Sequence, residues 1–336
     1  MYGVTILDIA KITGFSKATV ARAFANPEQV RPATLEIIRT AARTMGYRPN
    51  AIARAMITKR TGNLAFIIYG KQAPVITNPF YGPVLESVVN AAQRKGYSVF
   101  IVSDEEMRLP SGSIMLEKQV DGTIFASQPD PEMLNLYKST GTPVVLLNHV
   151  SETDDVISVT ADDYGGVFLA VEHLYSLGRR SFALIEGNFT EYIRNLRKQA
   201  YIDALKKFGL VYDERMVELV EPHVADAELG MRNILERSGN NSPDAVLCMN
   251  DIIAAGAMKA LQAAGRRIPQ DTAVVGYDDS SICTYCNPEL TSIDGGKERM
   301  GEEAVRILCE LIEKKENVEP VCLDVRLSIK GSTVSK

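Results

Sequence analysis

The sequence predicts an all-α helix-turn-helix domain followed by an α/β core of two lobes, each a doubly wound parallel sheet. Between residues 5 and 24, apolar residues recur at helical spacing on both sides of a glycine. From residue 64 onward, short β-branched runs alternate with amphipathic stretches, which is the pattern of parallel strands covered by helices. A chain of 336 residues, 46% of them hydrophobic, is long enough to bury more than one core.

The first predicted helix begins after Thr5, whose side chain can cap it together with Asp8. Ile9 and Ala10 then fall on one face, which marks the side of the helix that packs against a neighbour. Gly14 supplies the turn, because glycine readily adopts the backbone conformation that ends a helix. These features predict a short helix closed by a tight turn.

A second helix follows, and Ser16 can cap it. Val20 and Phe24 point back toward the first helix at helical spacing. An exposed face with Lys, Thr and Arg suits the major groove of DNA, although an ordinary small helical bundle with a charged face has the same pattern. The residues of this outward face are Lys17, Ala18, Thr19 and Arg22.

A third helix completes the small core, because Pro32 stands at a first-turn position and apolar residues recur at helical spacing as far as Met45. After it, Asn50 can cap a short helix that carries Arg54 and Met56. A helix of about two turns is marginal in water. The segment 50–57 is therefore expected to be a linker that becomes helical only against a partner surface.

The charge of the chain is unevenly distributed. Residues 1–60 hold 10 Lys and Arg against 3 Asp and Glu, whereas the remainder holds 27 against 39. A basic head on an acidic body fits a polyanion-binding module attached to a body that stays off the polyanion. The sequence has no apolar run of about 18 residues and no secretory leader, so a cytoplasmic protein with no membrane partner is expected.

The rest of the chain alternates between the two patterns that build a parallel sheet. The apolar runs compatible with buried strands cover 64–69, 97–102, 122–126, 143–147, 181–185, 245–249 and 272–277. The amphipathic stretches expected to be helices are 84–95, 166–177, 196–208, 251–264 and 297–313.

The common signatures of catalysis and cofactor binding are missing from the sequence. Gly-x-Gly-x-x-Gly, P-loop and Gly-x-Ser-x-Gly patterns are absent, and no nucleophile with a neighbouring base stands out. We therefore expect no enzyme activity and no cofactor. Cys283 and Cys286 form a C-x-x-C, which fits a redox pair or half of a zinc site. Buried free thiols are the favoured interpretation, because no second C-x-x-C follows and the histidines are scattered.

Several motifs, in this order, resemble the LacI/GalR family of transcriptional regulators and cover almost the whole chain. They are VTILDIAKITGFSKATVARAF, GYRPNAIARAM, NPFY, KQVDGTIF, CMNDIIAAGAM, RRIPQDTAVVGYDD and PELTSI. The resemblance implies a homodimer with an N-terminal DNA-binding domain and a hinge helix. It also implies a core like periplasmic sugar-binding proteins, with Rossmann-like lobes and a small effector held between them.

The resemblance also implies where the domains begin and end. The helix-turn-helix domain is expected over residues 1–48, the hinge helix and linker over 49–61, and the effector-binding and dimerisation core over 62–336. Within the core the first lobe is expected to take about 62–161 plus 294–322. The second lobe is expected to take about 162–290 plus 323–336.

The expected DNA contacts divide into base-reading, phosphate-contacting and hinge positions. Lys17, Ala18 and Arg22 match the base-reading positions of the family, and their chemistry agrees, since Arg can bond guanine twice and an Ala methyl can meet a thymine methyl. The phosphate-contacting matches are Thr5, Ser16, Thr19 and Tyr47, and Asn50, Arg54 and Met56 complete the set in the hinge. Met56 stands where the family usually has a Leu that wedges into the minor groove. Ala21 and Ala25 depart from the family pattern, and each removes a polar contact.

The expected effector site lies where the ends of strands meet. Arg197, Asn250 and Asp278 match the principal effector ligands of the family, and amide, carboxylate and guanidinium groups are what a polyhydroxyl ligand requires. Asn148 and Asp162 match the pocket edges, and Phe80 and Tyr81 are candidates for its first-lobe wall. For the polar residues the alternative is a helix cap or a turn, and for the aromatic pair it is core packing.

A departure from the family pattern leaves the identity of the effector open. Where relatives often stack an aromatic ring on a sugar, the alignment puts Ala225. The expected function is an effector-controlled repressor of a carbohydrate catabolic operon, with a palindromic operator and a sugar or sugar derivative as partners. The alternatives are a solute-binding or chemoreceptor protein of the same fold without a DNA role, and an enzyme on an α/β scaffold. No leucine heptads end the chain, so a dimer is expected rather than a tetramer.

Overall fold

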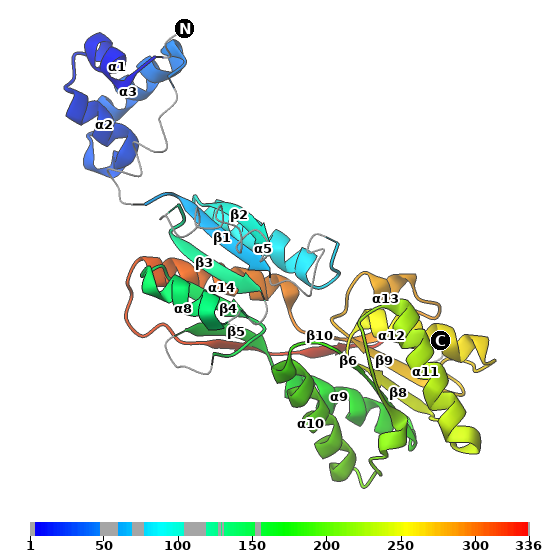
Figure 1. The fold of residues 1–336 in the computed structure, drawn as a ribbon. Helices are drawn as coiled ribbons and strands as arrows, with labels where there is room; N and C mark the ends of the chain where they lie inside the picture. The colour runs from blue at the N-terminus through cyan, green and yellow to red at the C-terminus, as the bar shows by residue number, and fades with distance from the viewer. Residues whose placement is uncertain are drawn as a thin grey trace.

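The computed structural model describes residues 4–47, 60–68, 77–103, 119–126, 129, 131–151 and 156–334. Its N-terminal part is a small helical head (Figure 1). Ile9, Val20 and Ile38 are fully buried in the centre of this head, one from each helix. The elements of the head are α1 (Ile6–Thr13), α2 (Lys17–Ala25), the 3-10 turn η1 (Pro27–Gln29) and α3 (Pro32–Met45).

The first lobe is a sheet with strand order β11-β5-β4-β3-β1-β2, and every pair of neighbours runs parallel. Helix α14 and helix α5 pack together against one face of this sheet. The strands are β1 (Asn63–Ile68), β2 (Ser98–Ser103), β3 (Gly122–Ala126), β4 (Val144–Leu147), β5 (Ile157–Ala161) and β11 (Val321–Leu323). The helices are α5 (Tyr81–Arg94), α8 (Pro131–Ser139) and α14 (Lys297–Ile312).

The second lobe repeats the arrangement with strand order β12-β10-β9-β8-β6-β7, in which only β12 runs antiparallel to its neighbour. The strands are β6 (Phe182–Gly187), β7 (Val217–Val220), β8 (Ala245–Cys248), β9 (Ala273–Tyr277), β10 (Thr291–Asp294) and β12 (Arg326–Ser328). The helices are α9 (Asp163–Ser176), α10 (Glu191–Lys207), α11 (Val224–Ser238), α12 (Asp251–Ala263) and α13 (Ile282–Tyr285), with short turns η3 (Glu214–Met216) and η4 (Gly239–Asn241).

The described chain passes between the lobes after β5, after β10 and after β11. Each lobe is therefore built from segments that are far apart in the sequence (Figure 1). The carboxyl ends of parallel strands are where α/β folds bind ligands. The loop after β4 belongs to the first lobe and the loop after β9 to the second. Both loops lie at carboxyl ends of strands, where a ligand site is expected.

The fold class predicted from the sequence is confirmed, and so is each predicted strand and helix that falls on described residues, to within a few residues. Helix α10 starts at Glu191 rather than at 196, because Thr190 has the extended backbone of an N-cap residue. The sequence pattern missed the strands β5, β7, β10, β11 and β12 and the helices α8, α11 and α13. Strands β5, β7 and β10 have four or five residues, and each carries at least one polar or charged side chain, so none forms a continuous apolar run. The predicted hinge helix 50–57 lies outside the described residues.

Candidate functional site

The two helices of the N-terminal motif are fixed by local hydrogen bonds. The Asp8 carboxylate accepts the Thr5 N–H at 2.9 Å and the Thr5 hydroxyl at 2.7 Å, and these bonds lower the pKa of Asp8. Gly14 ends α1 with a φ of 74°, a conformation that favours glycine. Ser16 caps α2, because its Oγ accepts the Thr19 N–H at 3.1 Å. The orientation of α2 is thus set by the residues that flank it.

Helix α2 turns one polar face to solvent. Lys17, Ala18 and Arg22 are exposed, whereas Val20 and Ala23 are buried against the head. Within the described part of the chain, neither Lys17 nor Arg22 forms an ion pair. Two unpaired cations on an exposed helix are available to an anionic partner such as a phosphate or a guanine edge.

Tyr47 stands at the end of α3, beside the second helix. Its ring lies 5.3 Å from that of Phe24, and its N–H donates to the Ala42 carbonyl at 2.9 Å. Partial burial raises the pKa of the Tyr47 phenol, so the phenol stays protonated and can donate a hydrogen bond. The remaining expected DNA contacts, Asn50, Arg54 and Met56, lie outside the described residues.

Arg197 of α10 is fixed in place within the second lobe. Its guanidinium bonds the Asp163 carboxylate, with Nε at 3.0 Å and Nη2 at 2.8 Å from Oδ1, and Nη1 bonds the Met249 carbonyl at 2.5 Å. The guanidinium carbon lies 3.5 Å from the centre of the Tyr277 ring. Burial lowers the pKa of Arg197, but Asp163 and Tyr277 more than reverse this, so its pKa is raised and the side chain stays charged.

Asp278 follows β9 and has unused hydrogen-bonding capacity. Its N–H donates to the Ile293 carbonyl at 2.8 Å, but its buried carboxyl accepts no hydrogen bond from the described residues. Burial raises the pKa of Asp278 to about 8; Arg197 opposes this rise and Asp251 adds to it. Its φ of 105° is rare for a residue with a side chain. No hydrogen bond in the described chain supports the alternative role of Asp278 as a turn cap.

The first lobe contributes Tyr81 and Asn148 to the same place. Tyr81 is buried at the start of α5, and the neighbouring Asn148 side chain partly offsets the effect of burial on the pKa of its phenol. Burial raises the pKa of this phenol. The charge of Asp278 raises it further and that of Arg197 lowers it, so these second-lobe side chains lie near the first-lobe residue Tyr81. Asn148 has a φ of 55°. Phe80 meets Tyr81 edge to face at 4.9 Å and packs on the first-lobe core.

Asn250 and Asp162 both cap helices. The Asn250 Oδ1 accepts the Ile253 N–H at 2.8 Å at the start of α12, and Asp162 accepts the Gly165 N–H at 2.8 Å at the start of α9. Asn250 is buried, and its amide nitrogen donates no hydrogen bond to the described residues. Asp162 is exposed, whereas the neighbouring Asp163 holds Arg197.

Sequence reasoning missed the buried charged residues that support this cleft. Asp251 accepts the Ser292 hydroxyl at 2.6 Å and the Ser280 N–H at 2.7 Å, and so anchors the loop after β9. Burial raises the pKa of Asp251. Asp163 and Lys297 are likewise almost fully buried. Asp163, Asp251 and Lys297 are each the first residue of a helix. A charged residue at that position, close to an apolar strand or a glycine pair, is the sequence signal that could have indicated them.

The C-x-x-C pair shows no reactive environment. Cys283 is buried and Cys286 is half-buried, and burial raises the pKa of both thiols. Within the described ranges, no three His, Cys, Asp or Glu side chains are grouped to hold a metal ion. A thiol with a raised pKa is a poor nucleophile and a poor metal ligand at neutral pH.

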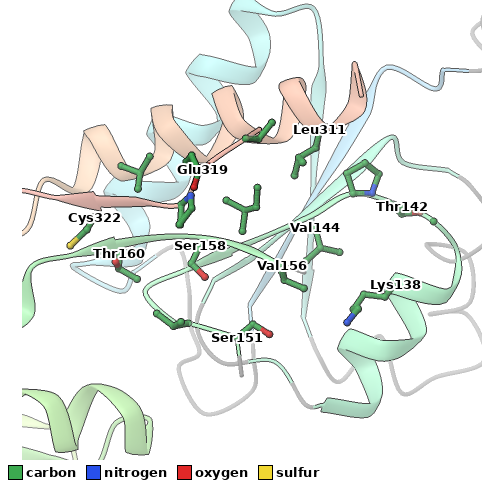
Figure 2. A pocket seen from close by; sticks show the side chains of 17 residues that line it. Lys138, Thr142, Val144, Ser151, Val156, Ser158, Thr160, Leu311, Glu319 and Cys322 are labelled. Atoms are coloured by element: carbon green, nitrogen blue, oxygen red, sulfur yellow. The ribbon is translucent and has the colours of Figure 1, made fainter. Parts of the chain in front are cut away.

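A separate open groove of about 830 Å³ lies on the first lobe, beside β4, β5 and β11 (Figure 2). Val144, Val156 and Leu311 are among its apolar lining residues, and Lys138 and Glu319 are among its polar ones. None of the seven residues expected to bind an effector lines this groove. We therefore base the ligand site on the cluster around Asp278 and not on this groove.

Comparison with known proteins decides the family. The family described as bacterial regulatory proteins, lacI family, matches residues 5–50, and the periplasmic binding protein-like domain matches residues 171–333. The HTH-type transcriptional regulator CelR of Thermobifida fusca is 32% identical over 98% of both chains. The chain belongs to the LacI family. It is a DNA-binding transcriptional regulator with a helix-turn-helix head and a two-lobed core.

Other relatives of this LacI-family regulator agree. Catabolite control protein A of Priestia megaterium is 31% identical over 93% of both chains. The solved structure of a CelR–cellobiose complex has a TM-score of 0.75 at 29% identity and covers 98% of this chain and 99% of that one. A lac repressor dimer bound to operator and an anti-inducer has a TM-score of 0.83 at 23% identity over 99% and 100%, which shows the shared fold. In the described parts of the chain, no helix is long and apolar enough to span a membrane.

Proposed function

We propose that this regulator is a repressor of a carbohydrate catabolic operon, controlled by a small sugar or sugar derivative bound between the lobes. The observation that carries the effector site is the buried Asp278 carboxyl, which accepts no hydrogen bond from the described residues and lies in the field of the fixed Arg197. An acceptor that the surrounding protein leaves without a donor is available to a ligand. Sugar hydroxyls supply donors to Asp278 and acceptors to cations and amides.

The wall of the proposed cleft comes from both lobes. Tyr81 and Asn148 lie on the first lobe, and Arg197, Asn250 and Asp278 on the second. A ligand that bonds both walls favours one angle between the lobes. The name of one similar solved structure includes cellobiose and that of another includes bound ribose, which supports a carbohydrate as the ligand class. Phe80 and Asp162 complete the proposed site at its edges.

The DNA-binding role is proposed for the exposed face of α2. Lys17, Ala18 and Arg22 would read base edges in the major groove, and Thr5, Ser16, Thr19 and Tyr47 would bond phosphates. Asn50, Arg54 and Met56 would contact the minor groove between the two half-sites. A palindromic operator follows from a homodimer, because two heads related by a twofold axis read two half-sites.

Exposed apolar side chains on the second lobe support the homodimer. Leu219 on β7 and Leu229 on α11 are 53% and 57% exposed, and Tyr285 is 83% exposed. Large apolar side chains that are this exposed can be covered by a second subunit. As a regulator of transcription, the protein would act in the cytoplasm at the nucleoid. The relatives are regulators, which supports a role without catalysis; the basic head disfavours the alternative of a solute-binding protein.

The test is operator selection by the purified protein, with and without a panel of sugars that includes cellobiose and ribose. We expect a palindromic site to be enriched and one sugar to change its affinity. Asp278→Ala should bind the operator and ignore that sugar. Asp271→Ala, a surface change on the same lobe, should respond like the wild type. An unchanged sugar midpoint in Asp278→Ala would refute the assigned cleft.

A further inference from the structure

Lys297 is a buried cation at the first position of α14, where the chain passes from the second lobe into the first. The N-terminus of a helix carries partial positive charge, so a cation is unfavourable there. Burial adds to the unfavourable energy, since only 5% of Lys297 is exposed. Because both effects are unfavourable, tertiary contacts must stabilise Lys297 at this position.

Those contacts lead to the loop after β9, on the other lobe. The Lys297 ammonium donates to the Asp278 carbonyl and, at 3.2 Å, to the Asp279 carbonyl. The carboxylate with which it pairs, Asp294, is farther away, at 3.7 Å. Lys297 therefore ties the first-lobe helix α14 to the second-lobe loop that carries Asp278.

The loop needs such support because its backbone is strained. Asp278 and Asp279 have φ values of 105° and 45°, which residues with side chains rarely adopt. Lys297 supports the loop from the first lobe. Lys330 supports it from within the second lobe, since its Nζ lies 2.5 Å from the Asp279 carboxylate. The two lysines bond the same loop, but Lys297 connects it to the first lobe and Lys330 connects it to the second.

The crossing that precedes Lys297 is suited to act as a pivot. Gly295 and Gly296 lie between β10 and α14, and Gly296 has a φ of 72°. Glycine tolerates wide changes in backbone angle without steric conflict. The relative position of the loop and α14 therefore depends on side-chain ties such as that of Lys297 more than on the stiffness of the backbone.

Helix α14 is in turn locked to α5. A Cβ on Gly301 would lie 2.7 Å from the Val84 carbonyl, so the backbones of the two helices approach closely at this point. The Ser87 hydroxyl donates to the Glu298 carbonyl at 2.5 Å across the same contact. Helix α5 begins with Tyr81, in the cleft. A displacement of α14 is thus shared by α5 and by the first-lobe wall of the cleft.

We propose that Lys297 is a positioning residue that transmits occupancy of the cleft at Asp278 to the paired helices α14 and α5. The inference rests on the proposed function, in which an effector binds the Asp278 carboxyl group. When the ligand draws this side chain, the loop carbonyls move and carry the Lys297 ammonium with them. The first lobe then turns about Gly295 and Gly296.

The first test needs no effector and uses amide hydrogen exchange on the full-length protein. The Met300 amide, bonded to the Gly296 carbonyl at 2.8 Å, reports on the first turn of α14, and the Asp278 amide reports on the loop. Lys297→Met should speed exchange at both amides by about tenfold or more. The matched control Lys330→Met should speed it at Asp278 alone. Lys297→Arg should restore slow exchange, and wild-type exchange at Met300 in Lys297→Met would overturn the proposal.

The second test uses cellobiose as the probe and compares operator affinity with and without it. In the wild type the ratio should be about 5-fold to 150-fold. In Lys297→Met the ratio should fall below about twofold at saturating cellobiose, whereas Lys330→Met should shift the midpoint and keep the ratio. A full ratio in Lys297→Met contradicts the proposal. If the wild type ignores every sugar, the proposed effector class fails, and the exchange result still decides the role of Lys297.

Discussion

Replacing Asp278 by Asn should change how the stability of the protein depends on pH. Burial raises the pKa of this carboxyl to about 8, against 3.8 for the unperturbed group. Between these values the folded state keeps a proton that the unfolded state releases. The free energy of unfolding therefore falls as pH rises from about 4 to about 8, and it falls by about 1.4 kcal/mol per pH unit for one proton.

The magnitude over an accessible range follows directly. From pH 5 to pH 8 the loss amounts to about 4 kcal/mol for a single carboxyl. Asn has the same shape, carries no charge at any of these pH values and is among the residues that tolerate a φ of 105°. Arg197 keeps its partner Asp163. Asp278→Asn should thus be more stable than the wild type at pH 8 and nearly equal to it at pH 4.

The assay is urea unfolding at pH 5, 6, 7 and 8, at one fixed protein concentration. The control is Asp271→Asn, because hydrogen bonds from Arg267 lower the pKa of Asp271. The stability that Asp271 contributes is present above its unfolded pKa and is lost only in stronger acid, so this variant should leave the slope between pH 5 and 8 unchanged. If Asp278→Asn keeps the wild-type slope, the carboxyl is already ionised in the empty cleft and the reasoning fails. If the effector binds the ionised form, its affinity should also rise with pH up to about 8.

Three further predictions concern the head and the first lobe. Ser16→Ala should destabilise the head by about 1 kcal/mol, measured as a lower melting temperature of residues 4–47 by NMR, because the N-cap bond to the Thr19 N–H is lost; an unchanged melting temperature would contradict the cap. Arg22→Ala should weaken operator binding by about 1 to 3 kcal/mol and relax preference at one position of each half-site, measured by binding to a set of single-base operator variants. Equal weakening on all sequences would assign Arg22 to a phosphate. Gly301→Ala should destabilise the first lobe by about 1 to 3 kcal/mol in chemical unfolding, since its Cβ would collide with the Val84 carbonyl, and wild-type stability would show that the helices separate freely.

The sequence by itself determined the head and the fold class, because their signals are local. The cap formed by Thr5 and Asp8 spans three residues, and Gly14 sits where a helix must end. The exposed and buried faces of α2 follow from helical periodicity alone. Buried parallel strands are continuous apolar runs, so most of them were also predictable. The short strands β5, β7 and β10 mix polar with apolar residues, so they escaped this pattern.

Only the tertiary structure decided the electrostatics of the cleft. Asp163 and Asp162 are adjacent and chemically identical in the sequence, yet one is buried against Arg197 and the other is an exposed cap. The pKa of Asp278 depends on desolvation by segments from both lobes, and its loop is held by a lysine 19 residues away. Desolvation and pairing are properties of surfaces that meet only after folding. The sequence predicted a cleft between the lobes. The packing of distant segments decided that Arg197 is paired with Asp163 and that the Asp278 carboxyl accepts no hydrogen bond from the described residues.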